Sequence, residues 1–317
     1  MTLVAACICT YRREQQLTTL LDSLAAQEFP QHPATRLHVI VVDNDSDATA
    51  ENCCRRFAAQ GRLAQLTYRH EPRRGISFAR NTGLDLVPAD ADFVAITDDD
   101  AVADPRWIDT LLTAQAATDA DIVLGPSIAT FAADMPAWLG ASGCFDKPPE
   151  YREFENLGEA QTGATCNLFM RGSMARQPDV RFHPELSLSG SEDNLFLREL
   201  KLAGYRLVWS TEALIYEPVT PARATLDYLC RESYRRGLTS IWIKQYLRRK
   251  QGKSFALRRP LRDLGKGIAV AWSGGISAVL NRGKPDRERR LAQAMCEFYR
   301  GVGIVAGVFG IRSRHYL

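Results

Sequence analysis

Short apolar, β-branched runs alternate with helical segments along the first two-thirds of the chain, and this alternation limits the fold more than any other feature. The expected strands are residues 3–9, 37–42, 63–68, 93–97, 121–125, 165–170 and 206–210. Strands separated by helices of ten or more residues form βαβ units, which predicts an α/β fold with a mostly parallel central sheet. Ligands of such sheets bind beyond the carboxyl ends of the strands, so polar residues there are the candidates for a functional site.

The charge of the chain is unevenly distributed. Residues 223–317 contain 21 Lys and Arg against 6 Asp and Glu, a net charge of +15, whereas residues 1–222 carry −12. This change predicts a catalytic domain over residues 1–222 and a basic amphipathic helical region over residues 223–317. A surface of this charge favours a polyanionic partner, either an anionic membrane or nucleic acid. We expect no nucleic acid, because the basic region has no recognisable binding motif and no interleaved aromatic residues.

Two apolar stretches in the basic region, residues 268–280 and 301–311, are each flanked by Arg and Lys. They are too short to span a hydrocarbon core of about 30 Å, but they suit helices that lie in the interface of an anionic leaflet. The alternative is a pair of helices that pack on the catalytic domain with a solvated basic face. The chain has no signal peptide pattern and no long apolar run, so we expect a cytoplasmic protein that associates peripherally with the inner face of the cytoplasmic membrane.

Three consecutive aspartates, Asp98, Asp99 and Asp100, follow the apolar run at residues 93–96. Adjacent carboxylates repel one another by about 1 kcal/mol per close pair even in water, so this pattern requires a compensating charge. A divalent cation is suitable, because Mg²⁺ binds through one or two carboxylates together with phosphate oxygens of a substrate. The alternative is an acidic turn that caps the following helix, which does not explain why three carboxylates are adjacent.

A second set of polar residues follows the earlier strands. Thr10 and Tyr11 come after the first strand, Asp43 comes after the second, and residues 75–81 open a helix that contains Arg80. The start of a helix offers free N–H groups to a phosphate, and an arginine can bind it through two hydrogen bonds. Asp43 alone could equally form a turn, but together these residues indicate a nucleoside diphosphate site at one edge of the sheet.

Glu192 and Asp193 lie just before an apolar helical segment and allow two interpretations. Ser189 and Glu192 have the spacing of a capping box, in which both side chains bind backbone N–H groups at the start of a helix. Asp193 is not needed for that motif, and a carboxylate on the same face of the sheet as the aspartate triplet could serve as a general base. The local sequence leaves both interpretations open.

Six motifs occur in a fixed order: Cys9-Thr10-Tyr11-Arg12, Val42-Asp43-Asn44, residues 75–81, Asp98-Asp99-Asp100, residues 162–167 and Glu192-Asp193. In this combination, over roughly residues 2–222, the chain resembles the family-2 glycosyltransferases, which have the GT-A fold. The whole chain, including its basic region, is similar to the succinoglycan-type exopolysaccharide glucosyltransferases of bacterial envelopes. That closer resemblance rests on residues 9–12, 80–81, 162–167 and 217–219.

The resemblance implies an activity. The expected reaction is the inverting transfer of one sugar, a hexose such as glucose, from a nucleoside-diphosphate sugar to a hydroxyl of a lipid-linked saccharide, in exopolysaccharide or envelope polysaccharide synthesis. The expected donor is a UDP-sugar, and Mg²⁺ or Mn²⁺ is the expected cofactor. The expected partners are therefore the donor, the lipid-linked acceptor and an anionic membrane surface.

The resemblance also implies roles for individual residues. Those expected to bind the donor are Thr10, Tyr11, Asp43, Arg80, Asn81, Asp98 and Asp99, and those expected to bind the metal are Asp98 and Asp100. The two expected at the reaction centre are Asp193 as the general base and Glu192, which would position the acceptor.

The chain departs from the family pattern at two places. Many relatives have a histidine where this chain has Tyr216, which puts a third protein ligand to the metal in doubt. The Q-x-x-R-W signature of processive synthases is absent, so we expect a non-processive enzyme. There are two alternative functions. One is a catalytically inactive GT-A-like scaffold that recruits polysaccharide enzymes to the membrane. The other is a sugar-phosphate nucleotidyltransferase, which would need a glycine-rich basic N-terminal loop that this chain lacks.

Overall fold

The computed structural model describes residues 1–142, 144–145, 147, 153–161, 163–252 and 286–311, with single residues and short runs between 261 and 280. The chain divides into two compact units. The first unit contains residues 1–128, 146–187 and 192–218, and the second contains residues 129–145, 188–191 and 219–317. The second unit therefore includes the basic region of the sequence together with two shorter segments that come before it in the chain.

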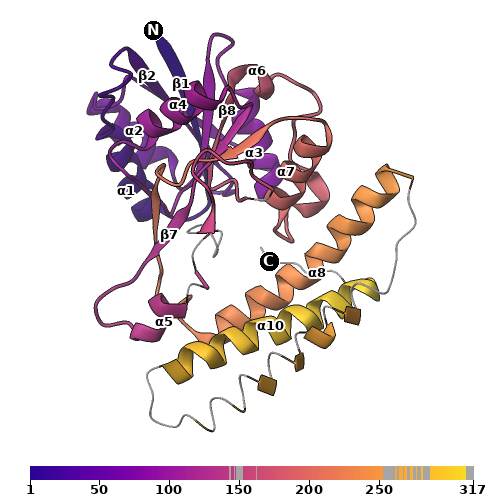
Figure 1. The fold of residues 1–317 in the computed structure, drawn as a ribbon. Helices are drawn as coiled ribbons and strands as arrows, with labels where there is room; N and C mark the ends of the chain where they lie inside the picture. Colours follow the sequence, from indigo (N-terminus) through magenta and orange to yellow (C-terminus); the bar gives the residue numbers. More distant parts are fainter. Residues whose placement is uncertain are drawn as a thin grey trace. The chain divides into compact units, whose positions relative to one another are not determined.

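A seven-stranded sheet forms the centre of the first unit, with the strand order β3-β2-β1-β4-β8-β6-β9. Figure 1 labels three of its strands, β1, β2 and β8. The strands are β1 (Thr2–Thr10), β2 (Thr35–Asp43), β3 (Gln65–His70), β4 (Phe93–Asp98), β6 (Ile122–Leu124), β8 (Asn167–Arg171) and β9 (Leu207–Trp209). Strand β8 runs antiparallel to β4 and β6, and the other neighbouring pairs are parallel. The predicted α/β fold with a mostly parallel central sheet is confirmed, and each of the expected strands is present.

Helices follow most of the strands of the first unit. They are α1 (Glu14–Ala25), α2 (Glu51–Ala59), α3 (Ile76–Asp85), α4 (Trp107–Thr118), α6 (Gly172–Ala175) and α7 (Glu192–Leu202), with a 3-10 turn at Pro184–Leu186. A small second sheet contains β5 (Val102–Ala103), β10 (Ile215–Pro218) and β7 (Ser127–Thr130), in that order. This second sheet is not evident from the sequence, because strands of two to four residues are too short to show an alternating pattern.

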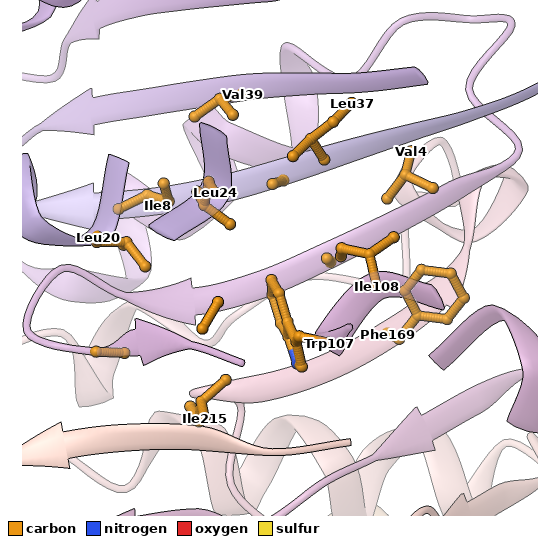
Figure 2. Close-up of a cluster of buried hydrophobic side chains, with 14 of the residues drawn as sticks. Val4, Ile8, Leu20, Leu24, Leu37, Val39, Trp107, Ile108, Phe169 and Ile215 are labelled. Atoms are coloured by element: carbon orange, nitrogen blue, oxygen red, sulfur yellow. The ribbon is translucent and has the colours of Figure 1, made fainter. Parts of the chain in front are cut away.

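Two apolar clusters cover the faces of the central sheet, and β1 contributes to both. Val4, Ala6 and Ile8 belong to the cluster that includes α1, α2 and α4, whereas Ala5 and Cys7 belong to the cluster that includes α3 and α7. Successive side chains of a strand point to opposite faces, so a strand buried on both sides is apolar throughout. Figure 2 shows the first of these clusters, with side chains from strands and from helices α1 and α4. This core holds the carboxyl ends of β1, β2 and β4 at one edge of the sheet.

Asn167 fixes the start of β8 next to the end of β4. Its side chain is fully buried and accepts a hydrogen bond from the indole N–H of Trp107 at 2.8 Å. Its amide group donates to the carbonyl oxygens of Pro126 at 2.9 Å and Ala213 at 2.7 Å. A buried amide that satisfies three partners is costly to replace, because each partner would lose its hydrogen bond away from water. The last residue of the motif at 162–167 thus has a structural role, while residue 162 lies outside the described part of the chain.

The second unit contains α5 (Ala137–Ser142), α8 (Leu226–Lys250) and α10 (Asp286–Val308). Glycines allow α8 and α10 to pack closely. A Cβ atom on Gly237 would lie 2.1 Å from the carbonyl oxygen of Arg300, and one on Gly303 would lie 2.0 Å from that of Tyr234. The helical character expected for the basic region is therefore observed where the structure describes it. Over the described residues, we find no helix long and apolar enough to cross a membrane.

Candidate functional site

The polar residues that follow β1, β2 and β4 lie side by side. Thr10 is paired in register with Asp43, and Cys9 is paired with Asp98. The hydroxyl group of Thr10 donates a hydrogen bond to the Asp99 carboxylate at 2.8 Å. Because parallel strands end at the same edge of a sheet, residues far apart in the sequence meet here. This part of the predicted site is brought together as expected.

Two arginines compensate the charge of the aspartate triplet. Arg13 donates to the carboxylates of Asp99 at 2.9 Å and Asp100 at 3.0 Å, and Arg80 donates to Asp98 at 3.0 Å. None of the three aspartates caps α4, because that helix begins after Arg106 and has no side-chain cap. Arg13 is not among the residues expected from the sequence, although its position two residues after Tyr11 places it at the same edge of the sheet.

The three carboxylates do not share one environment. Burial raises the pKa of Asp99 to about 6, against the lowering effect of Arg13. Burial also acts to raise the pKa of Asp98, but the positive charges of Arg80 and Lys147 outweigh it, and the pKa of Asp98 is lowered. Asp98 is therefore ionised at neutral pH, whereas the pKa of Asp99 lies above that of an ordinary aspartate.

Arg80 joins the aspartate triplet to the start of α7. Its guanidinium group is buried and binds Asp98 through one terminal nitrogen, and Thr165 and Glu192 through the other, the latter at 2.9 Å. It also lies over the ring of Phe182, 5.2 Å from the ring centre. These contacts favour a positioning role for Arg80 over the direct contact with donor that the resemblance implies.

Glu192 and Asp193 lie in the first turn of α7 in different surroundings. Glu192 is buried against Arg80, whereas Asp193 is partly exposed and accepts a hydrogen bond from the backbone N–H of Asn194 at 2.7 Å. The hydroxyl of Ser189 has no hydrogen-bond partner among the described residues, so the capping box considered from the sequence does not form. Asp193 remains the carboxylate of this pair that an acceptor can approach, and its role as base stays a prediction.

Asp43 organises the turn after β2. Its carboxylate is fully buried and accepts hydrogen bonds from the backbone N–H groups of Asp45 at 3.0 Å and Ala50 at 2.8 Å, and from the hydroxyl of Tyr68 at 3.1 Å. This matches the turn-forming interpretation that the sequence left open. A contact between Asp43 and a nucleoside stays a prediction.

The remaining donor candidates differ in their access to a ligand. Asn81 forms two hydrogen bonds with the backbone of Phe182, at 2.8 and 2.9 Å, and so fixes that segment against α3. Tyr11, in contrast, is exposed, with the guanidinium groups of Arg12 and Arg74 at 5.4 and 6.0 Å from its ring centre. An exposed aromatic ring flanked by cations suits the binding of a nucleobase beside phosphates, as predicted for Tyr11.

Two further charged residues adjoin the site and were not selected from the sequence. The ammonium group of Lys147 binds the Glu217 carboxylate at 2.5 Å, and the hydroxyl of Ser127 donates to the same oxygen at 3.3 Å. Glu217 belongs to the segment that carries the closer resemblance, but no local pattern distinguishes Lys147. It comes 47 positions after Asp100 and reaches the site only through the fold.

The donor atoms at this edge suit a hard divalent cation. No three His, Cys, Asp or Glu side chains of the described residues are grouped as a metal site. Asp98 and Asp100, however, are carboxylates at the end of β4 that arginines hold in place, Arg80 for Asp98 and Arg13 for Asp100. Mg²⁺ binds through one or two carboxylates when a substrate supplies phosphate oxygens, so these residues fit that ion in that mode.

Comparisons with known proteins agree on one family. The sequence profile of glycosyl transferase family 2 matches residues 5–175. The chain is 36% identical over 236 residues to the succinoglycan biosynthesis protein ExoM of Rhizobium meliloti (strain 1021). The aligned region covers 73% of this chain and 72% of that protein.

Solved structures show the same fold. The mannosyltransferase PcManGT of Pyrobaculum calidifontis, in complex with GDP-Man and Mn²⁺, aligns with a TM-score of 0.61 at 20% identity, over 97% of this chain and 87% of that one. S. aureus TarS 1–349, in complex with UDP-GlcNAc, aligns with a TM-score of 0.52 at 17% identity, over 98% and 92% of the two chains.

The contacts of Arg80 generate a test of its role. Arg80→Met should lower the free energy of unfolding by about 3 kcal/mol or more, because the buried Glu192 loses its cation. Urea denaturation measures this change. Arg176→Met, at an exposed arginine after α6, should stay within about 0.5 kcal/mol of the parent. If Arg80→Met lowers the free energy of unfolding as little as Arg176→Met does, Arg80 has no structural role and serves only to bind a ligand.

Proposed function

The chain belongs to glycosyl transferase family 2 and is related to a succinoglycan biosynthesis protein, and from this we propose that it transfers one hexose, such as glucose, from a UDP-sugar to a hydroxyl group of a lipid-linked saccharide. The observation that carries the proposal is the Arg80 bridge. It connects the aspartate triplet, which suits a diphosphate with its metal, to the turn that contains Asp193. A site for the leaving group and a candidate base are thereby joined in one network, as a displacement at a sugar carbon requires.

The donor assignment rests on the edge of the sheet. Thr10 ends β1 and Tyr11 follows it, and the acidic triplet begins at the last residue of β4. Arg13 connects these two strand ends through its contacts with Asp99 and Asp100. An aromatic ring, cations and metal-binding carboxylates are the groups that a nucleoside diphosphate requires. Two proteins of the same fold were solved with UDP-GlcNAc and with GDP-Man, which supports a nucleotide-sugar donor for this chain.

We assign metal binding to Asp98 and Asp100. A bound Mg²⁺ or Mn²⁺ supplies Lewis-acid neutralisation of the charge that develops on the departing diphosphate. Arg13 and Arg80 hold the two carboxylates in place, since each arginine contacts one of them. Thr10 and Arg13 in turn hold Asp99, which lies between the two proposed ligands in the sequence.

We propose a single displacement with inversion at the anomeric carbon. The acceptor hydroxyl oxygen attacks that carbon, Asp193 takes the hydroxyl proton, and the bond from the carbon to the diphosphate oxygen breaks. The nucleoside diphosphate leaves with the electron pair of that bond. Glu192 is buried against Arg80, so we assign it to positioning Arg80 and Asp193 rather than to contact with the acceptor.

We further propose that the basic region, residues 223–317, binds the inner face of the cytoplasmic membrane and that residues 1–222 form the catalytic domain. Ile268, Trp272, Ile276 and Leu280 are helical, lie four positions apart and are exposed, Trp272 to 70%. An exposed apolar stripe in a region of net charge +15 suits a helix that lies in an anionic interface.

The second apolar stretch, residues 301–311, is used differently. Gly303 and Ile304 belong to the face of α10 that packs against α8, and Ile304 is 3% exposed. This part is therefore used in packing between two helices of the second unit, which differs from the alternative of two helices packed on the catalytic domain. Only its end, at Phe309 and Ile311, presents large apolar side chains to the surroundings. The membrane proposal accordingly rests on the stretch at 268–280 and on the basic charge.

Asp193→Asn tests the proposed base. The variant should lose about 10²–10⁴ in turnover, the usual contribution of a general base, and should keep its affinity for UDP. Transfer from labelled UDP-glucose to membranes that contain lipid-linked acceptor gives the rate, and calorimetry gives the affinity. Glu199→Gln, on the same helix, is the matched control and should transfer normally. Near-normal transfer by Asp193→Asn would remove Asp193 from the mechanism.

Metal removal tests the proposed ligands. EDTA and Asp100→Ala should each weaken UDP binding by about tenfold or more, which corresponds to about 1.4 kcal/mol. Calorimetric titrations of UDP with Mn²⁺ and with EDTA measure the two effects. Asp134→Ala, at an exposed aspartate of the second unit, should behave as the parent chain does. Equal affinity in Mn²⁺ and in EDTA would contradict metal-dependent binding.

Vesicle sedimentation tests the membrane proposal. The full chain should sediment with anionic liposomes at low salt and less at high salt, because salt screens the attraction. The double variant Trp272→Glu and Ile276→Glu should sediment several-fold less, because two charges replace apolar contacts in the interface. Leu202→Glu, at a similarly exposed leucine of the first unit, is the control and should not change sedimentation. A full chain that ignores anionic vesicles at low salt would overturn the proposal.

A further inference from the structure

Lys147 is held in a defined position by its backbone and its side chain. Its backbone N–H and carbonyl form two hydrogen bonds with Ser127, both at 3.0 Å, in a short antiparallel bridge. Its ammonium group binds Glu217 at 2.5 Å, and Ser127 donates to that carboxylate as well. The side chain of Lys147 is 29% exposed and that of Glu217 is 12% exposed. The residue is thus fixed at three points, two on its backbone and one at the end of its side chain, in a mostly buried setting.

Lys147 lies near the acidic triplet, because its partner Glu217 follows Tyr216, which pairs with Val102, two residues after Asp100. Burial acts to lower the pKa of Lys147, but the nearby negative groups, Glu217 first and Asp98 and Asp100 among them, raise it above its ordinary value. The same proximity acts in the other direction, since the charge of Lys147 contributes to lowering the pKa of Asp98. Lys147 is therefore a permanent cation within electrostatic range of the two carboxylates assigned to the metal.

Three cations near the aspartate triplet, Arg13, Arg80 and Lys147, differ in how they are used. Arg13 is shared between Asp99 and Asp100, and Arg80 is shared between Asp98 and Glu192. Among the residues that the structure describes, Lys147 forms an ion pair with one carboxylate, that of Glu217. An ammonium group has three N–H donors, so a single carboxylate does not use its full capacity. Lysine also binds phosphate as a compact point charge that adapts to the position of the oxygens.

We propose that Lys147 binds the diphosphate of the nucleotide donor, as a cation supplied by the protein next to the metal, with Glu217 and Ser127 as the residues that position it. This inference rests on the proposed function, because it assumes that a nucleoside diphosphate occupies the edge of the sheet. Phosphate binding by Lys147 has one consequence that binding through the metal alone does not have. The site keeps a phosphate-dependent share of its affinity when divalent ions are absent.

The test compares UDP with uridine in the presence of EDTA, by calorimetry on the full chain. Lys147→Gln should weaken UDP binding by about ten- to a hundredfold, as for one hydrogen bond to a charged group, and should leave uridine binding unchanged. Lys147→Arg keeps the charge and should restore part of the UDP affinity. The matched control is Lys201→Gln, because Lys201 is 31% exposed and is also paired with a glutamate, but at a different part of the first unit. It should bind both compounds as the parent does.

A second variant separates binding from folding. Lys147→Gln leaves Glu217 buried without its cation, whereas Lys147→Gln combined with Glu217→Gln removes both charges. The double variant should show the same selective loss of UDP affinity. If these variants bind UDP with unchanged affinity, or lose affinity equally for UDP and uridine, the proposed role of Lys147 is wrong and the proposed function is unaffected. Failure of the parent chain to bind UDP or GDP, with or without Mn²⁺, would overturn the proposed function and this inference with it.

Discussion

The repulsion among carboxylates at the carboxyl edge of the central sheet is the constraint on which the rest of the site depends. Asp98, Asp99 and Asp100 follow one another at the end of β4, and the fold brings Glu192 to the same edge. Arg13 and Arg80 compensate part of this charge from α1 and α3. The arginines are shared between carboxylates, so each one fixes two segments of chain at once. The charge that remains is what suits the edge to a divalent cation and a diphosphate.

Buried ion pairs and hydrogen bonds also hold the side chains of the site in fixed positions. Arg80 lies on α3, whose apolar face packs against the sheet, and its guanidinium group reaches both β4 and α7. Burial strengthens these ion pairs and also makes them costly to break, because an unpaired buried charge has no water to replace its partner. A residue that the sequence suggests as a donor ligand therefore serves as the link between two parts of the site. Asn167 has a comparable role for neutral groups, since its amide ties three segments near the end of β4.

The second unit follows different physics. Its helices α8 and α10 approach closely because Gly237 and Gly303 leave no side chain between their backbones. Packing of this kind depends on shape rather than charge. Several basic residues of the two helices are exposed, such as Arg231, Arg249 and Arg300, whereas Arg235 is mostly buried against Glu232. The apolar residues at 301–308 are partly used in this packing, which the composition alone could not distinguish from membrane contact. Exposed apolar residues at 268–280 show the opposite behaviour and keep the character expected of an interfacial helix.

The sequence by itself determined the α/β fold, the strands of the central sheet and the edge at which polar residues meet. These follow from periodicity and from the rule that parallel strands end together, and both are local properties of the chain. Only the tertiary structure decided the partners of the charged groups. It assigned Asp43 to a turn and Arg80 to a bridge, it showed that Ser189 does not cap α7, and it brought Lys147 next to Glu217. The physical reason is that the partner of a charge depends on distance in space, which the spacing of residues in the sequence does not contain.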